Sequence, residues 1–133
     1  MELFVLCRGR WGRVVYAVEQ GGGNRASTFF EGLSSADRVK MGTLFKRFAE
    51  FGEIKNREKF KKIADDLFEF KSHQVRMFCF IDARTVVLTH GCIKKRDALN
   101  SADIERAQRI KAEHLKALAQ PAGKFGVQRP NKK

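Results

Sequence analysis

Basic side chains interrupt apolar, strand-like segments at three points in the second half of the chain. Lys71 ends one such segment, Arg76 follows a short turn at the start of the next, and the run Lys94, Lys95 and Arg96 follows a third. A charged side chain on a core strand must face solvent or a binding surface, because burial without a partner is costly. Neighbouring antiparallel strands can place such residues on one face of a sheet. The pattern therefore predicts a phosphate-binding face.

The net charge of the chain also points to a polyanionic partner. Lys and Arg total 27 and Asp and Glu total 15, so the formal charge is +12. Nucleic acid is the first candidate, because each phosphate that a cation neutralises releases counterions. An anionic membrane and a merely soluble surface are the other two interpretations. The basic segment 55–62 supplies three candidate RNA contacts, and a solvated surface is the equally weighted alternative for Lys59, Lys61 and Lys62.

The residues around these cations predict a sheet. Three strand-like runs, 66–71, 75–81 and 84–90, are separated by short turns and indicate an antiparallel meander. Apolar and polar residues alternate in the first two runs, as expected for strands with two different faces. In the first run this alternation puts Glu69 and Lys71 on the same face.

The first half of the chain predicts a β-hairpin and two helices. Strand-like residues 2–7 and 13–19 flank a turn, and a short helix is expected over 25–33. A longer helix begins after Ser34, which can cap it, and ends at Gly52. Its apolar side chains follow one another at helical spacing and predict a buried stripe: Met41, Leu44, Phe45, Phe48 and Phe51.

A last helix is expected between Asn100, a good N-cap, and Pro121, with an apolar edge made by Ile104, Ala107, Leu115 and Leu118. The prediction is one α+β domain over residues 1–119. It contains a twisted antiparallel sheet of about four to five strands, with two N-terminal helices and one C-terminal helix. Residues 120–133 are basic and poor in apolar side chains, so they are expected to form a disordered tail.

Cysteine usage and hydropathy predict a cytoplasmic protein. Cys7, Cys79 and Cys92 are odd in number and widely spaced, which is typical of structural thiols in a reducing compartment. No apolar run approaches the roughly 20 residues that span a bilayer. The His and Cys residues lack the spacing of a metal site, so neither a metal nor another cofactor is expected.

Four segments in a fixed order resemble the RelE/HigB-like toxins, and their phage-derived branch most of all. LFEFK at 67–71 is similar to the branch's "L-W/F-E-L-R", and VRMF at 75–78 to an Arg followed by apolar residues. VLTHGCIKK at 87–95 resembles "L-L-H-x-F-x-K-K", and IERA at 104–107 resembles a helix with "E-I-x-x-A". The resemblance covers about residues 60–116.

The resemblance implies a RelE-like fold and the toxin of a type II toxin–antitoxin system. Such a toxin cleaves messenger RNA on the ribosome and is inhibited by a cognate antitoxin, often a helix-turn-helix protein. Arg76 matches the strand Arg that contacts phosphate and stabilises transition-state charge, and Lys71 takes the place of a second Arg. Lys94 and Lys95 match the terminal basic pair, and His90 matches a common family His.

These residue types suit RNA cleavage by the adjacent 2′-hydroxyl. The protein must orient that hydroxyl, stabilise the charge on the phosphorane and assist two proton transfers. Arg offers phosphate oxygens a rigid fork, which Lys71 lacks. No Tyr or His follows Lys94 and Lys95, where some RelE-type enzymes place a proton-transfer residue. His90 and Glu69 are each either a proton carrier or a structural residue.

A second class of function is compatible with the same residues. The chain is then a non-catalytic phage protein that uses this fold to hold RNA or a protein partner. The missing proton-transfer residue favours this alternative, whereas the intact Arg76 and the Lys94–Lys95 pair favour the enzyme.

Overall fold

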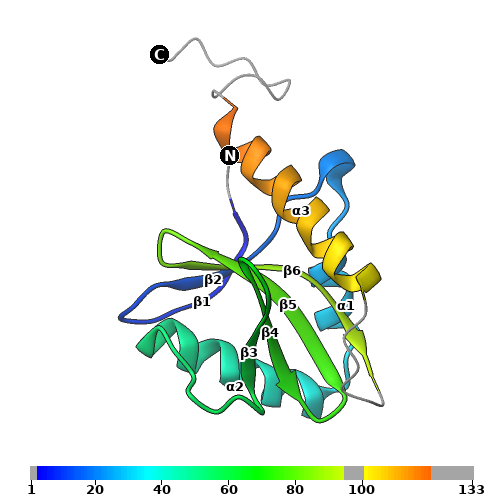
Figure 1. Cartoon of the computed structure of the whole chain (residues 1–133). Helices are drawn as coiled ribbons and strands as arrows, with labels where there is room; N and C mark the ends of the chain where they lie inside the picture. Colours follow the sequence, from blue (N-terminus) through cyan, green and yellow to red (C-terminus); the bar gives the residue numbers. More distant parts are fainter. Residues whose placement is uncertain (1–2, 95–100, 121–133) are drawn as a thin grey trace.

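The computed structural model describes residues 3–94 and 101–120, which form a mixed α+β domain (Figure 1). Within these ranges the strands are β1 (Val5–Arg8), β2 (Arg13–Tyr16), β3 (Phe60–Ala64), β4 (Leu67–Ser72), β5 (Val75–Asp82) and β6 (Thr85–Ile93). The helices are α1 (Arg25–Glu31), α2 (Ser35–Phe51) and α3 (Ser101–Ala119), with a short 3₁₀ turn, η1 (Gln20–Gly22). The predicted α+β class, with two helices before the meander and one after it, is confirmed.

All six described strands belong to one sheet, in the order β1-β2-β6-β5-β4-β3. The predicted hairpin and the meander of β4, β5 and β6 are confirmed, and both are antiparallel. The expectation of about four to five strands, all antiparallel, is wrong in two respects. β3 adds a strand at the edge of the sheet; it begins within the basic segment 55–62 and ends two residues after that segment. β2 runs parallel to β6, with Val14 beside Val86.

One face of the sheet packs against α2 (Figure 1). The Ser34 side chain accepts a hydrogen bond from the Asp37 N–H at 3.2 Å, and this cap begins the helix as predicted. Gly52 ends the helix in the left-handed region (φ 73°), where a Cβ would collide with Trp11. Four of the five predicted stripe residues are buried, but Phe51 is 68% exposed because the helix ends beside it.

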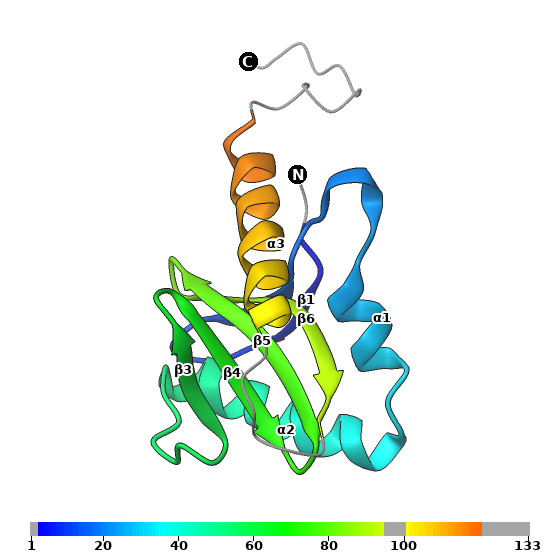
Figure 2. The ribbon, with the colours of Figure 1, turned by 45° about the vertical axis from the view of Figure 1, so that its right-hand side comes forward.

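The opposite face of the sheet packs against α3, as Figures 1 and 2 show. Ala107 and Ile110 of α3 meet apolar side chains of β4, β5 and β6. His114 is also buried, and its Nδ1 accepts the Val18 N–H at 2.9 Å. The expected apolar edge is therefore only partly correct: Leu115 and Leu118 are 36% and 41% exposed.

The short helix α1 follows the glycine-rich segment after β2. Asn24 caps it by accepting the Ser27 N–H at 2.9 Å. It ends at Glu31, two residues earlier than predicted, because Gly32 forms its C-cap. None of the helices in the described ranges is long and apolar enough to cross a membrane. The predicted cap Asn100 lies outside the described residues, as does the predicted tail 120–133 apart from its first residue.

Candidate phosphate-binding site

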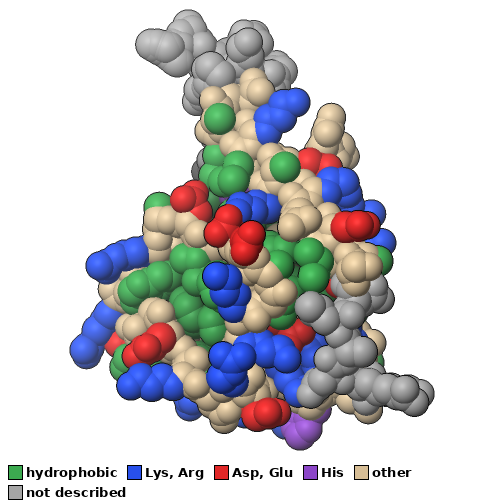
Figure 3. Space-filling view, viewed as in Figure 1, with side chains coloured by type: hydrophobic (Ala, Val, Ile, Leu, Met, Phe, Trp, Pro, Cys, Tyr) green, Lys and Arg blue, Asp and Glu red, His purple; other side chains and the backbone are tan. Residues whose placement is uncertain are grey.

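The strand register brings the predicted basic residues of the meander together. Lys71 of β4 lies directly opposite Arg76 of β5, and Arg76 lies opposite Cys92 of β6. Lys94 follows two residues after Cys92, and its backbone N–H donates to the Gln74 carbonyl at 2.8 Å. The three strands therefore present these side chains on the face that α3 covers in part. Figure 3, which views this side, shows Lys and Arg side chains gathered below α3.

A buried carboxylate lies among these cations. Glu69 of β4 is 5% exposed; its Oε1 is 3.8 Å from Arg76 Nε and its Oε2 is 4.0 Å from Lys61 Nζ. Burial raises the pKa of Glu69, and the charges of Lys61, Arg76, Lys94 and Lys71 lower it in part. We call these five residues the Glu69 cluster. It combines a carboxyl of raised pKa with four cations, and groups of perturbed pKa beside charged partners cluster at functional sites.

Arg76 is less accessible than an open phosphate-binding face requires. The residue is only 3% exposed, and its Nη1 donates to the backbone carbonyls of His73 at 2.6 Å and Val75 at 3.3 Å. The turn between β4 and β5 therefore fixes the orientation of the guanidinium. Of the two surroundings expected for its charge, solvent or a binding surface, the structure excludes open solvent, because Glu69 and the turn carbonyls surround the guanidinium. Lys71 lies nearer the surface, and its Nζ is 3.5 Å from Glu58 Oε1.

A second acidic residue, Asp103 in the first turn of α3, contacts the end of β6. Its Oδ1 is 3.3 Å from His90 Nε2, and its Oδ2 is 3.2 Å from Lys94 Nζ. Cys92 Sγ is 3.9 Å from the same Oδ2. Asp103 was not among the predicted site residues, because its partners His90 and Lys94 lie 13 and 9 positions away, on β6 and directly after it. Asp103 thus positions Lys94 relative to the sheet.

His90 is a buried member of this second group. It is 2% exposed, its Nδ1 is 3.3 Å from Thr89 Oγ1, and its ring lies 4.8 Å from that of Phe78. Burial lowers the pKa of His90, although Asp103 opposes the shift, so the imidazole is neutral near pH 7 and donates its Nε2–H to Asp103. Of the two roles considered for His90, the geometry supports the structural one.

A comparison with known families bears on what this arrangement does. The profile of the family described as phage derived protein Gp49-like (DUF891) matches residues 28–112, which is more than half of the chain. The chain belongs to this family. The match includes every member of the Glu69 cluster and Asp103, and the Gp49-like family is a toxin-like family. None of the curated proteins that were compared with the chain matches it.

The other predicted RNA contacts of this Gp49-like protein do not form one patch. Lys61 belongs to the Glu69 cluster, whereas Lys62 borders a hollow beside Phe80 and α3. Lys59 is exposed on the α2 side of the sheet. Lys95 and Arg96 lie outside the described residues. Within the described ranges, no three His, Cys, Asp or Glu side chains are placed to hold a metal ion.

The position of Asp103 predicts a measurable effect on the stability of this Gp49-like protein. Replacing Asp103 by alanine should lower the free energy of unfolding by about 2–3 kcal/mol, because the buried His90 and the half-buried Lys94 each lose a carboxylate contact. Urea unfolding measures the difference. Glu105→Ala is the matched control, since Glu105 is exposed on the same helix and should change stability by about 0.5 kcal/mol or less. Equal effects of the two variants would contradict the assigned role.

Proposed function

We propose that this Gp49-like protein is the toxin of a type II toxin–antitoxin system and acts in the cytoplasm by cleaving messenger RNA on the ribosome. The observation that carries the proposal is the Glu69 cluster, which sets a carboxyl of raised pKa among four cations on one face of the sheet. Membership of a toxin-like, phage-derived family supports it. A cognate helix-turn-helix antitoxin is the expected inhibitor.

In the proposed reaction an RNA phosphate takes the place of Glu69 as the partner of Arg76. The guanidinium and the ammonium groups of Lys71 and Lys94 then stabilise the negative charge that develops on the phosphorane. The released Glu69 carboxylate accepts the proton of the 2′-hydroxyl, whose oxygen attacks the adjacent phosphorus. The bond to the 5′-oxygen breaks, and a lysine of the cluster protonates that oxygen. The products are a 2′,3′-cyclic phosphate and a 5′-hydroxyl.

A non-catalytic RNA- or partner-binding protein is the second candidate function. The observation that favours it is the burial of Arg76, whose charge already has Glu69 and the β4–β5 turn as partners. An external phosphate must displace the Glu69 contact before Arg76 can take part in catalysis. A protein that only binds RNA with surface cations needs no such exchange.

Induced expression of the wild-type chain in a bacterial host should arrest growth, because cleavage of messenger RNA stops translation. Arg76→Ala should relieve the arrest, since it removes the proposed phosphate fork. Growth curves with immunoblots of the soluble fraction provide the measurement. Harmless expression of the wild-type chain at confirmed soluble levels would contradict the proposal. If the Arg76→Ala variant arrests growth at the same soluble level, the result would favour the second candidate, a non-catalytic RNA- or partner-binding protein.

A further inference from the structure

A basic groove on the α2 side of the sheet carries cations that the Glu69 cluster does not contain. It lies between α2 and the β4–β5 turn and encloses about 380 Å³. Lys40 and Arg47 line it from α2, Lys59 from the segment before β3, and His73 from the turn. All four residues are exposed. We call this surface the α2 groove.

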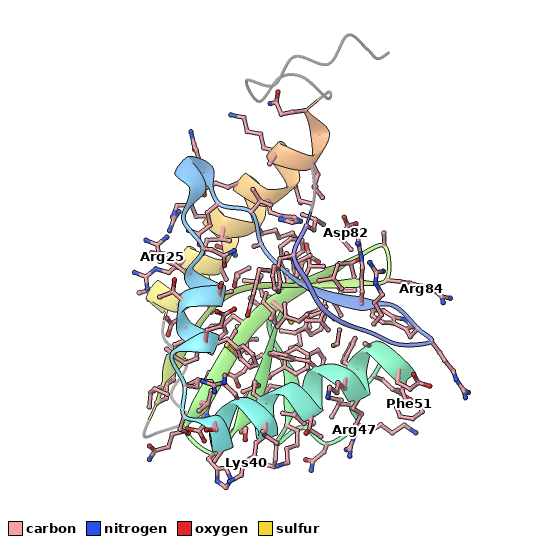
Figure 4. All side chains as sticks on the ribbon, turned by 180° about the vertical axis from the view of Figure 1, so that it is seen from behind. Arg25, Lys40, Arg47, Phe51, Asp82 and Arg84 are labelled. Atoms are coloured by element: carbon pink, nitrogen blue, oxygen red, sulfur yellow. The ribbon has the colours of Figure 1, made fainter. Side chains whose placement is uncertain are left out.

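The local structure holds these cations on one surface. Lys40 and Arg47 are seven residues apart, about two helical turns, so they lie on the same side of α2; Figure 4 labels both. The Lys59 carbonyl accepts the Lys71 N–H at 2.8 Å, which fixes the backbone of the segment before β3. His73 has a left-handed backbone (φ 56°) at the tip of the turn. The α2 groove is therefore a defined surface of the fold.

The charges of the α2 groove differ from those of the Glu69 cluster in one respect. Lys71, Arg76 and Lys94 each lie within 4.0 Å of a carboxylate. Within residues 3–94 and 101–120, Lys40, Arg47 and Lys59 have no such partner, and no carboxylate lines the groove. Cations that share a hollow repel one another, and an external polyanion relieves that repulsion.

The α2 groove and the Glu69 cluster share the β4–β5 turn as a common wall. Lys71 and Ser72 are consecutive in β4, so their side chains point to opposite faces; Ser72 lines the groove and Lys71 belongs to the cluster. The carbonyl of His73 holds Arg76 at 2.6 Å, while His73 also lines the groove. A strand of RNA that passes around this turn would contact both surfaces.

We propose that the α2 groove binds the phosphates of single-stranded RNA, as an extension of the RNA strand held at the Glu69 cluster. Val39, which is 67% exposed, and the His73 ring add surfaces on which bases can pack. The inference rests on the proposed function only for the choice of RNA as the ligand. It concerns binding and assigns the groove no part in the chemical step.

The test measures the affinity of the purified full chain for a labelled oligouridylate of about 12 nucleotides over a range of salt concentrations. The triple variant Lys40→Gln, Arg47→Gln, Lys59→Gln should bind about tenfold more weakly at low salt. The slope of its log affinity against log salt concentration should be shallower by about 2, because each of the three lost phosphate contacts contributes about 0.7 to the slope. A tetranucleotide, too short to reach both surfaces, should show a smaller difference.

The matched control is the triple variant Lys46→Gln, Arg84→Gln, Lys116→Gln, which removes the same charge from exposed positions outside the groove. It should keep a slope close to that of the wild type. Equal slopes for the two triple variants, or no salt-dependent binding by the wild type, would overturn the inference. Each single groove variant should account for part of the change. Binding that depends on the groove, without growth arrest in cells, would reject the proposed toxin function alone.

Discussion

Alanine at position 76 should reduce RNA cleavage about 10²–10³-fold, the loss typical of removing one preorganised donor to a transition-state oxyanion. The fork of Arg76 is oriented by the His73 carbonyl at 2.6 Å and by Glu69 at 3.8 Å, so no neighbouring side chain can replace its geometry. The measurement is single-turnover cleavage of a translated messenger RNA. Arg76→Lys keeps the charge without the fork and should lose most of the same activity.

Because Arg76 is buried, its replacement can destabilise the fold, so folding must be measured as well as activity. Removing the guanidinium leaves Glu69 with fewer partners, so the melting temperature of Arg76→Ala must be compared with that of the wild type. Arg76→Lys should unfold closer to the wild-type temperature. Lys116→Gln is the matched control, because α3 carries this exposed residue about 20 Å along its axis from Asp103. Full activity in a folded Arg76→Lys protein would contradict the role of the fork.

Replacing Glu69 by glutamine should slow cleavage about 10²–10⁴-fold while RNA binds as well as before or better. Glutamine keeps the shape of the side chain but cannot accept the 2′-hydroxyl proton. It also removes the carboxylate that competes with phosphate for Arg76 and Lys61. The separation of the two effects identifies a proton acceptor, because a purely structural role would weaken binding and cleavage together.

The pH profile provides the control for Glu69. Only the ionised carboxylate accepts a proton, so the wild-type rate should rise with pH through the raised pKa of Glu69 and then level off. In Glu69→Gln this rise should disappear. A variant with the wild-type profile would show that another group is the base.

Local sequence patterns predicted the parts of the molecule that depend on neighbours along the chain. The alternation in residues 66–71 put Glu69 and Lys71 on one face, and the short turn before Val75 placed Lys71 opposite Arg76. Ser34 and Gly52 marked the ends of α2 because capping is decided within one turn of a helix. These signals were sufficient to bring together two cations of the candidate site.

Features that depend on distant contacts were not predicted. The parallel pairing of β2 with β6 joins Val14 to Val86, and nothing within either strand encodes its direction. Nothing near Asp103 in the sequence indicates its contacts with His90 and Lys94, because they form only when α3 packs beside β6. The burial of Arg76 follows from the same assembly of strands and turn. Residue types thus suggested a phosphate-binding site, whereas the tertiary packing determines which side chains its residues contact.

The central claim is that the Glu69 cluster cleaves RNA, and the ends of the cleaved RNA test it most directly. Messenger RNA should be mapped after brief induction of the wild type, Glu69→Gln and Arg76→Lys at equal soluble levels. The account predicts new fragments with 5′-hydroxyl and 2′,3′-cyclic phosphate ends in the wild type, and about 10²-fold fewer or none with the two variants. Intact messenger RNA during wild-type growth arrest, or equal cleavage by all three proteins, would contradict it.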